Sequence, residues 1–420
     1  MGAVSAGLIV AGAGIAYPAT PVPSPAAGIP SAQSPAAQVP VPGAPAAGAA
    51  AGQAAAAAAQ PAVGAFLDSG TIGVQRMTDL SRWLGGAKLR VGHTYLPGDT
   101  WSGIEGRVGF LRSWSRWRRA EADRMFVLNV PMQEHNEDRV SDEEVRGLLA
   151  QGARGDFDEH YRNLARRLVR LGVPDTVIVL GWEMNGTTYT HRCGPDPEAW
   201  KTYWNRIVAA MRSVPGQSFK FDFTPNRGED AIPWTRCYPG DSTVDIVGMD
   251  SYDQPPGTTF DEQVKGPYGL QAQVDFAAAH NKQISYPEWG LFRNGDDTDY
   301  MSRMLAWFDQ HRPLYQTITD YCPHGVWQCG DNPGASEIYR RRIAQETGGT
   351  PSSRPPEPPP STGTDPGTEP TGPEPEPSDS YQWCVPLDLG EWLGHWQKPE
   401  RICTHVPVRL RHGQSEESDG

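Results

Sequence analysis

The chain has 420 residues and a formal net charge of −13. This acidity argues against nucleic acid or an anionic membrane surface as a partner, since both attract clustered Lys and Arg side chains. Residues 1–63 and 348–379 contain too few large apolar side chains to offset the entropy of ordering them. We therefore expect one large domain at 64–347. A signal-like segment with a disordered Ala/Pro-rich linker precedes it, a disordered Pro/Glu/Thr linker follows it, and a small Cys- and Trp-containing segment ends the chain at 380–420.

Near the start of the chain, a short apolar run from Ala6 to Ala16 is followed by small residues, as in the core of a secretory signal. The run is too short and too rich in Gly for a comfortable membrane span. No Lys or Arg precedes it, so whether it is cleaved stays open. We expect an exported protein that is secreted or associated with the cell surface or cell wall.

The chain has six cysteines and no C-x-x-C motif, a pattern that favours disulfides over a zinc site. Disulfides in turn indicate an oxidising compartment. No H-E-x-x-H motif or comparable His cluster occurs, and we expect neither a metal nor another cofactor. The economical pairing joins cysteines that are close in sequence, namely Cys193 with Cys237, Cys322 with Cys329, and Cys384 with Cys403.

From residue 64 to residue 343, short apolar runs alternate with longer segments of helical period. The segments that begin at Val74, Tyr161 and Trp200 each place their apolar residues on one helical face, which indicates core helices. The basic run RSWSRWRR at 112–119 is interpreted as the solvated face of another helix. The expected strands are 64–67, 87–91, 125–130, 177–182, 219–224, 244–249, 283–289 and 318–327.

Eight strands that alternate with helices fit either a closed (β/α)8 barrel or a doubly wound sheet. A doubly wound nucleotide binder should carry a Gly-rich fingerprint after its first strand. Here the first strand is followed by LDSGTIGVQ, which contains no such fingerprint. We therefore predict an α/β fold of the (β/α)8 TIM-barrel type, with its chemistry in the loops at the carboxyl ends of the strands.

Polar and aromatic residues that can hydrogen-bond to sugars or stack on them gather at these strand ends. Phosphate-binding glycine loops are absent from the same positions. The candidate sugar-binding residues are His93 after the second strand, Trp182 and Asn185 after the fourth, Asn226 after the fifth, Tyr252 after the sixth, Trp289 after the seventh and Trp327 after the eighth.

Two glutamates, Glu183 and Glu288, follow the fourth and seventh strands, which lie roughly opposite each other in such a barrel. Taken singly, each could be an ordinary loop acid. Glycoside hydrolysis needs two carboxyl groups, and a barrel can hold this pair about 5 Å apart, the separation of retaining enzymes. Desolvation and the charge of Glu288 should raise the pKa of Glu183 and keep it protonated as the acid.

The strand ends carry the motifs GWEMNG (181–186), TPN (224–226), GMDSYD (248–253), YPEWG (286–290) and VWQ (326–328). These motifs resemble glycoside hydrolase family 26, in the clan of (β/α)8 retaining glycosidases that includes β-mannanases. The resemblance spans about 64–343 and implies that Glu183 is the acid/base and Glu288 the nucleophile. It also implies that Tyr252 touches the nucleophile and that Trp327 lies under the sugar to be cleaved.

Trp182 departs from this family pattern, because mannan-cleaving members typically carry His directly before the acid/base. An imidazole nitrogen that can donate or accept is replaced by an indole with one donor. Since side chains alternate along a strand, we expect Trp182 to lean away from the side that Glu183 faces, or toward the rim. The departure also predicts a preference for a sugar other than mannose.

The expected function is a retaining, endo-acting glycoside hydrolase that cleaves a β-linked polysaccharide and works as a monomer. The alternatives are a non-catalytic carbohydrate-binding barrel and a tethered envelope protein. The C-terminal segment at 380–420 has several Trp and two Cys, and it is either an attachment module for glycan or cell wall or a disulfide-closed extension.

Overall fold

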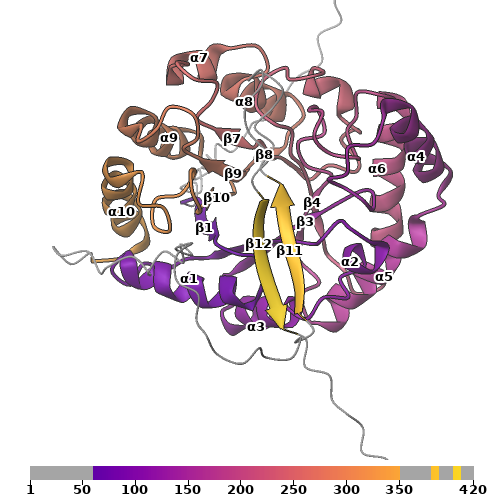
Figure 1. Ribbon diagram of the computed structural model, residues 1–420, viewed down its shortest axis with the longest axis horizontal. Helices are drawn as coiled ribbons and strands as arrows, with labels where there is room; N and C mark the ends of the chain where they lie inside the picture. Colours follow the sequence, from indigo (N-terminus) through magenta and orange to yellow (C-terminus); the bar gives the residue numbers. More distant parts are fainter. Residues whose placement is uncertain (1–59, 351–379, 387–400, 408–420) are drawn as a thin grey trace, which may run out of the picture. The chain divides into compact units, whose positions relative to one another are not determined.

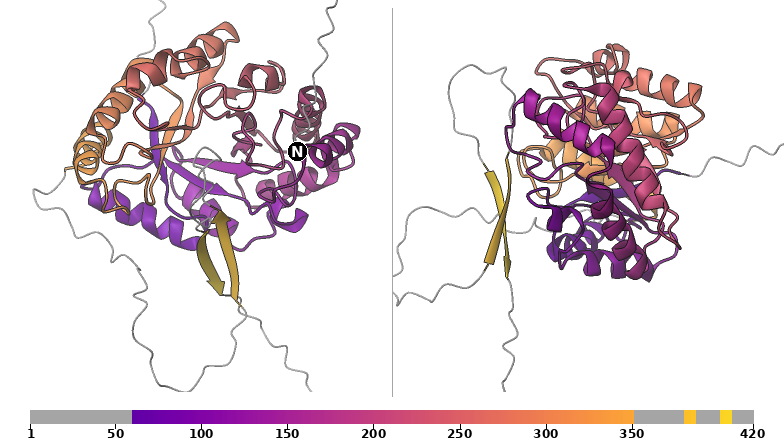
Figure 2. Two further views of the ribbon diagram at one scale, coloured as in Figure 1. Left: turned by 45° about the horizontal axis from the view of Figure 1, so that its top comes forward. Right: turned by 90° about the vertical axis from the view of Figure 1, so that its right-hand side faces the viewer.

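The computed structural model describes residues 60–350, together with two short strands at 380–386 and 401–407 of which only the backbone is described. Residues 60–350 form a parallel sheet whose strands alternate with surrounding helices (Figures 1 and 2). The strands are β1 (Ala62–Phe66), β2 (Val91–Tyr95), β3 (Met125–Val130), β4 (Val177–Leu180), β5 (Lys220–Phe223), β6 (Ile246–Val247), β7 (Ser251–Tyr252), β8 (Gln283–Ile284), β9 (Tyr286–Gly290) and β10 (Tyr315–Thr319).

The sheet closes into a ring because its sixth and seventh positions are each filled by two short strands. β6 pairs with β8 and β7 pairs with β9, so the chain at 246–252 lies beside the chain at 283–290 at two levels. β9 pairs with β10 and β10 with β1, while consecutive strands pair from β1 to β6. The result is a ring of eight parallel strand positions, which confirms the predicted (β/α)8 fold.

The helices around the ring bury apolar faces against the strands, as their period predicts. Trp200 and Trp204 of α6 are fully buried, and so are the apolar residues of α5 except the half-buried Val169. None of the described helices is long and apolar enough to span a membrane. The helices are α1 (Thr71–Trp83), α2 (Trp101–Ile104), α3 (Leu111–Ala120), α4 (Asp142–Arg154), α5 (Asp158–Arg170), α6 (Pro197–Arg212), the 3₁₀ turn η1 (Trp234–Cys237), α7 (Phe260–Lys265), α8 (Leu270–Ala279), α9 (Thr298–His311) and α10 (Pro333–Thr347).

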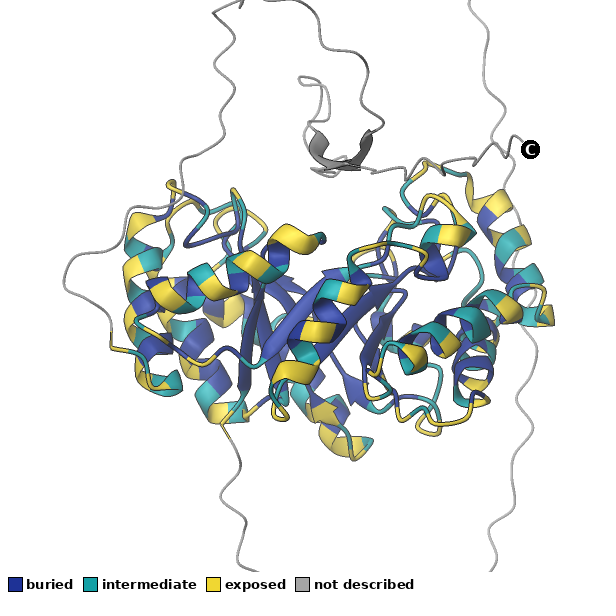
Figure 3. Cartoon of the chain, turned by 90° about the horizontal axis from the view of Figure 1, so that it is seen from below, coloured by how far each residue is buried: buried dark blue, intermediate teal, exposed yellow. Residues whose placement is uncertain are grey.

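The basic run at 112–119 lies in α3, as predicted. Trp114 and Trp117 are buried on the inner face of the helix, whereas Arg112 and Arg116 are exposed on the outer face. Figure 3 shows the same division around the ring, with the strands buried and the exposed residues on the outward faces of the helices.

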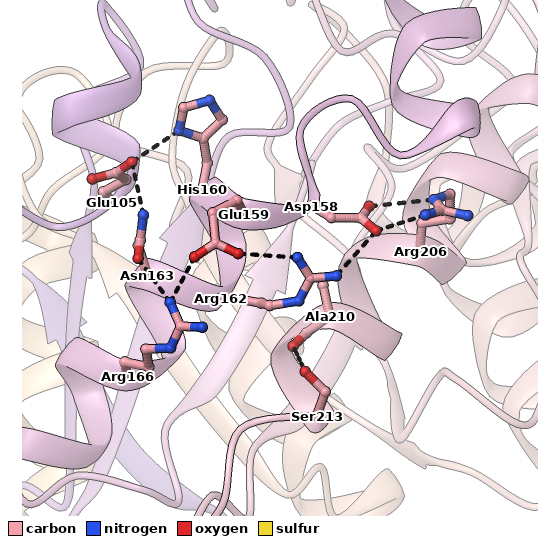
Figure 4. A network of polar contacts seen from close by, with 10 residues as sticks. All are labelled: Glu105, Asp158, Glu159, His160, Arg162, Asn163, Arg166, Arg206, Ala210 and Ser213. Carbon is pink, nitrogen blue, oxygen red and sulfur yellow. Dashed lines mark hydrogen bonds and ion pairs between the residues drawn. The ribbon is translucent and has the colours of Figure 1, made fainter.

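Charged side chains join α5 to its neighbours (Figure 4). His160 contacts Glu105 at the end of α2, with 2.9 Å between Nδ1 and Oε1. Asp158 accepts hydrogen bonds from Arg206 of α6 at 2.6 Å and from Arg162 at 3.4 Å. Asp158 is buried whereas Arg206 is partly exposed, so this ion pair links α5 to α6 at the border between core and solvent.

Two expected strands are displaced in the structure. The strand expected at 87–91 begins at Val91, and the strand expected at 318–327 covers only 315–319. Both strands contain polar residues, which interrupt the apolar pattern used to predict strands. In the fold these polar side chains point into closely packed surroundings. A Cβ on Gly92 would lie 2.7 Å from the Trp117 ring, so only glycine allows that helix to approach. In β10, Thr317 contacts His93 across the ring interior.

Two disulfides close loops of the described chain, and both were predicted. Cys193 is joined to Cys237 with their Cα atoms 6.1 Å apart, which links the loops after β4 and β5. Cys322 is joined to Cys329 within the loop after β10.

The third predicted pair lies in a separate hairpin. β11 (Ser380–Pro386) pairs antiparallel with β12 (Arg401–Pro407), and the backbones of Cys384 and Cys403 are directly opposite each other. The side chains of this hairpin lie outside the described residues, as does the apolar run at 6–16.

Replacing Cys193 and Cys237 by Ser should destabilise the barrel more than replacing Cys322 and Cys329. The first bridge spans 44 residues and the second 7, and the entropy that a crosslink removes from the unfolded chain grows with loop length. That relation gives about 4 kcal/mol for the longer loop and about 2 kcal/mol for the shorter one. Denaturant unfolding of the two double variants measures the difference. Equal losses, or a larger loss from the short loop, would contradict the expectation.

Candidate active site

Glu288, in β9, is the carboxylate around which the polar groups of the ring converge. It is only 8 % exposed. The Tyr252 hydroxyl donates to its Oε2 at 2.7 Å, and the Asn129 amide donates to its Oε1 at 3.3 Å. The Tyr95 hydroxyl also stabilises its charged form. Burial raises the pKa of Glu288, and these three side chains act in the opposite direction because they stabilise the charged form.

His93 lies behind this site and does not face a sugar, which corrects its predicted role. Its Nε2 is 2.8 Å from Asn129 Oδ1, and its Nδ1 is 3.1 Å from the Thr317 hydroxyl. The side chain is completely buried, and burial lowers its pKa to about 4. A neutral His93 therefore engages the Asn129 carbonyl and leaves the amide N–H of Asn129 directed at Glu288.

Glu183 reaches the site because the strand before it ends early. β4 stops at Leu180, after which Gly181 and Glu183 both have left-handed backbone conformations, with φ of 57° and 50°. Only glycine fits the first position, since a Cβ there would lie 2.4 Å from Met132 Sδ. Such a conformation is costly for a glutamate and is characteristic of functional sites. The Glu183 N–H donates to Thr224 O at 2.8 Å, which holds the turn in place.

The carboxyl of Glu183 lies in surroundings that differ sharply from those of Glu288. Its pKa is raised well above the ordinary value, first by burial and then by the negative charges of Glu288 and Asp230. Among the described residues no side chain donates a hydrogen bond to it. The surroundings of Glu183 therefore favour its protonated form more strongly than those of Glu288 do, since hydrogen-bond donors face Glu288 alone.

Asp250 is a further carboxyl beneath the pair. It is completely buried, and neither of its oxygens has a hydrogen-bond partner. Burial, Glu288, Glu183 and Asp222 all raise its pKa, so we interpret it as a neutral group. In the sequence, only its position at the end of the sixth expected strand indicated that Asp250 lies near the site.

Two other candidates face away from the site, which corrects their predicted roles. Trp289 is fully buried, donates its indole N–H to Gln316 at 2.7 Å and packs on Phe308 of α9. It follows Glu288 within a strand, so alternation turns it toward the helices. Asn185 is also fully buried, and it exchanges hydrogen bonds of 2.9 and 3.0 Å with the backbone of Asn226, which ties the loop after β4 to the loop after β5.

Trp182 lies beside the rim aromatics, 4 % exposed. Its ring contacts Tyr95, Tyr189 and His191 at centroid distances of 5.6, 5.0 and 5.2 Å. The alternation argument for its direction does not apply, because residues 181–183 form a turn and not a strand.

Two tyrosines that the motifs did not indicate lie near both glutamates. Burial has the largest effect on the pKa of the Tyr189 and Tyr321 hydroxyls and raises it. The negative charges of Glu183 and Glu288 raise the pKa of both hydroxyls further. Both residues lie in loops beyond the strand ends, where spacing carries no signal.

The remaining candidates stay on the rim side of the barrel. Asn226 is half-buried and donates to Asp230 at 3.0 Å. Trp327 is 6 % exposed, and its backbone N–H donates to Asp320 Oδ1 at 2.9 Å. Among the described residues, one group could hold a metal by position, namely Cys322, Cys329 and Asp331, but its two thiols are joined in a disulfide.

Known proteins resemble the chain in this region. The sequence model of glycosyl hydrolase family 26 matches residues 165–291, which include both glutamates. No curated protein matches the chain in sequence.

Solved structures share the fold at low identity. The catalytic domain of an endo-β-1,4-mannanase of this family from Bacillus sp. JAMB-750 is 17 % identical, with a TM-score of 0.50, over 68 % of this chain and 86 % of that chain. An endo-β-1,4-mannanase double mutant from Cellulomonas fimi is 18 % identical, with a TM-score of 0.50, over 63 % of this chain and 65 % of that chain.

These likenesses support a glycoside hydrolase, since the matched segment contains both candidate carboxyl groups and the solved structures share the barrel. The resemblance to glycoside hydrolase family 26 that the strand-end motifs indicate is confirmed, by the family's sequence model over residues 165–291 and by the fold of the barrel.

Proposed function

We propose that this protein is a retaining glycoside hydrolase that cleaves a β-linked polysaccharide internally, with Glu183 as acid/base and Glu288 as nucleophile. The observation that carries the proposal is the difference between the surroundings of two carboxyls, those of Glu183 and Glu288. Glu288 accepts hydrogen bonds from Tyr252 and Asn129, whereas Glu183 accepts none from the described side chains and has its pKa raised by the negative charges of Glu288 and Asp230. Two titratable groups whose pKa values are pushed apart in this way indicate an acid and a base.

The reaction would proceed in two displacements. Glu183 protonates the glycosidic oxygen while a Glu288 oxygen attacks the anomeric carbon, and the bond to the leaving sugar breaks. Glu288 then carries no charge, so the pKa of Glu183 falls and it can take a proton from water. That water attacks the anomeric carbon and releases Glu288. Tyr252 and Asn129 each hold one oxygen of Glu288, which fixes the direction of attack.

The substrate class follows from the rim and from the likeness to known enzymes. Asn226, Tyr252 and Trp327 are the predicted sugar-binding residues that stay on the rim side. Both solved structures named above are endo-β-1,4-mannanases, which makes internal cleavage of a β-linked glycan the first activity to test. Trp182 in place of the family's His favours a related polymer, such as mixed-linkage glucan, xylan or arabinogalactan, over mannan.

The proposal includes export and action on an extracellular or wall polysaccharide, which the two disulfides support because they persist in oxidising compartments. A non-catalytic sugar-binding barrel or a tethered envelope protein would need neither carboxyl. A Glu288→Gln variant that binds oligosaccharide but no longer cleaves it would exclude both alternatives. Reducing-sugar release and the sizes of the early products identify the substrate and the mode of cleavage.

Alanine replacements should separate the roles of the two glutamates. With an activated aryl glycoside, Glu183→Ala should regain turnover in azide and give a glycosyl azide of retained configuration, since only the acid/base is lost. Glu288→Ala with azide should give the inverted product, and Glu337→Ala, an exposed glutamate on α10, should behave as wild type. Proton NMR of the first-formed product of the unaltered enzyme should show retention. Inversion, or carboxyls at the roughly 6.5–9.5 Å of inverting enzymes, would contradict the assignment.

Removing the charge of Asp230 should lower the pH at which activity falls on the alkaline side. Asp230 is one of the charges that raise the pKa of Glu183, so Asp230→Asn makes ionisation of Glu183 easier and lowers its pKa. The alkaline limb of the kcat/KM profile then shifts to lower pH. Asp299→Asn, which removes an exposed carboxylate on α9, is the matched control and should leave the limb in place. An unchanged limb in Asp230→Asn would show that its charge does not act on the acid.

The unaltered enzyme should hydrolyse β-1,4-mannan poorly compared with its best substrate. The indole of Trp182 is bulkier than an imidazole and offers one donor where a His offers a donor and an acceptor. Trp182→His should reduce the native activity without creating a strong mannanase. Specific activities on mannan, mixed-linkage glucan, xylan and arabinogalactan provide the measurement. Robust mannan cleavage by the unaltered enzyme would overturn this interpretation of Trp182.

A further inference from the structure

Arg227 directly follows the TPN motif and takes no part in the proposed reaction. It lies in the loop after β5 and is half-buried. Its Nη2 donates a hydrogen bond to Tyr252 O at 3.0 Å and another to Gln254 O. One guanidinium nitrogen therefore holds two backbone carbonyls of the segment that begins with β7.

The strand that this arginine holds is short and is paired along one side. β7 consists of Ser251 and Tyr252, and both pair with β9. On the other side, within the described chain, pairing with the loop after β5 ends at the bridge between Asn226 and Asp250. The Tyr252 carbonyl lies beyond that bridge, so the Arg227 side chain takes the place of the next hydrogen bond of the ladder.

The backbone of Arg227 is itself fixed, on the side of the other glutamate. The Arg227 N–H donates to Asp250 O at 2.9 Å. The residue before it, Asn226, exchanges hydrogen bonds with Asn185, which lies two residues after Glu183. The loop after β5 thus joins the turn that carries Glu183 to β7.

Both carbonyls of β7 are held by side chains from outside the strand. The Tyr300 hydroxyl donates to Ser251 O at 2.8 Å, next to the Tyr252 carbonyl that Arg227 holds. Burial lowers the pKa of Arg227, and Tyr300 and Asp253 oppose that effect. These are the titratable groups that act on the guanidinium among the described residues.

Building on the proposed function, we propose that Arg227 is a positioning residue for the nucleophile, because it fixes the backbone of Tyr252 and so directs the Tyr252 hydroxyl to Glu288. That hydroxyl donates to Glu288 Oε2 at 2.7 Å. The bond stabilises the charged form of Glu288, which is the form that attacks the anomeric carbon. A displacement of β7 would weaken this bond and turn the carboxylate, and a misplacement of about 1 Å can cost about 100-fold in rate.

The test uses Arg227→Lys, Arg227→Gln, Tyr252→Phe and the double variant Arg227→Lys with Tyr252→Phe, each in the full chain. Lysine keeps the positive charge, but its shorter side chain ends in a strongly hydrated point charge. Glutamine keeps an N–H donor and removes the charge. Thermal unfolding of each variant shows whether it is folded.

Arg212→Lys is the matched control. Arg212 also holds two consecutive backbone carbonyls, Ser242 O at 2.8 Å and Thr243 O at 3.4 Å, but it does so before β6, at the opposite end of the strands. The kcat and KM are measured over a range of pH. The substrate is whichever of mannan, mixed-linkage glucan, xylan and arabinogalactan the unaltered enzyme cleaves fastest.

Arg227→Lys should lower kcat about 10- to 100-fold with a smaller change in KM, because it displaces a reacting group and leaves the other sugar contacts in place. Arg227→Gln should lose at least as much. In the double variant the change at Arg227 should add little to the loss from Tyr252→Phe, since it acts through Tyr252. Arg212→Lys should match the unaltered enzyme.

The acid limb of the kcat/KM profile should move to higher pH, because a weaker donor raises the pKa of Glu288. We expect a shift of about one pH unit in Tyr252→Phe, and a shift in the same direction in both Arg227 variants. The other titratable groups that interact with Glu288 are unaltered in every variant, namely Tyr95, Glu183, Tyr189, Asp250 and Tyr321.

Several results would overturn the positioning role. A loss of activity without movement of the acid limb, or losses that add in the double variant, would show that Arg227 does not act through Tyr252. Wild-type activity in both Arg227 variants would have the same consequence. If neither variant folds, Arg227 supports the barrel as a whole and the specific role is overturned. All of these leave the proposed function standing, whereas an unaltered chain that cleaves no glycan would overturn that function and this role with it.

Discussion

The hydrogen bonds to Glu288 are the interactions on which the rest of the site depends. Asn129 comes from β3 and Tyr252 from β7, so two separate strands must deliver donors to one carboxylate, and the Tyr95 hydroxyl of β2 also stabilises its charge. A buried carboxylate without such donors would take up a proton and lose its nucleophilicity. Closure of the ring brings these strands together, and the charge of Glu288 then raises the pKa of Glu183.

The site lies where regular strand structure is interrupted. The sixth and seventh positions of the ring are each split into two short strands, and the fourth ends in two left-handed residues. At each interruption, neighbouring side chains no longer have to point to opposite faces of the sheet. Glu183 and Trp182 therefore both lie at the barrel mouth, which an unbroken strand would not permit. The cost of the left-handed backbone at Glu183 is offset by the surrounding packing and by the hydrogen bond to Thr224.

Loops that carry site residues are held by contacts from outside the ring. The bridge between Cys193 and Cys237 anchors the segment that presents Tyr189, and Asn185 ties that segment to the loop after β5. The Cys322–Cys329 bridge and Asp320 do the same for Trp327. Without these contacts the loops would sample many conformations. Because they are already ordered, the site loses less conformational entropy when a ligand binds.

Apolar periodicity and cysteine spacing were enough to predict the barrel and the two disulfides, and strand-end chemistry singled out Glu183 and Glu288, whose roles stay a proposal. These features are local or follow from the ring order, so a sequence records them. The burial of His93 and Asn185, the outward direction of Trp289 and the bounds of β2 and β10 depended on which neighbour each side chain met. Asp250 was marked only by its place at a strand end, and Tyr189 lies in the loop after Glu183, whose course only the fold decides. Tyr321 joined the site only through tertiary structure, because distances between loops far apart in the chain leave no trace in local spacing.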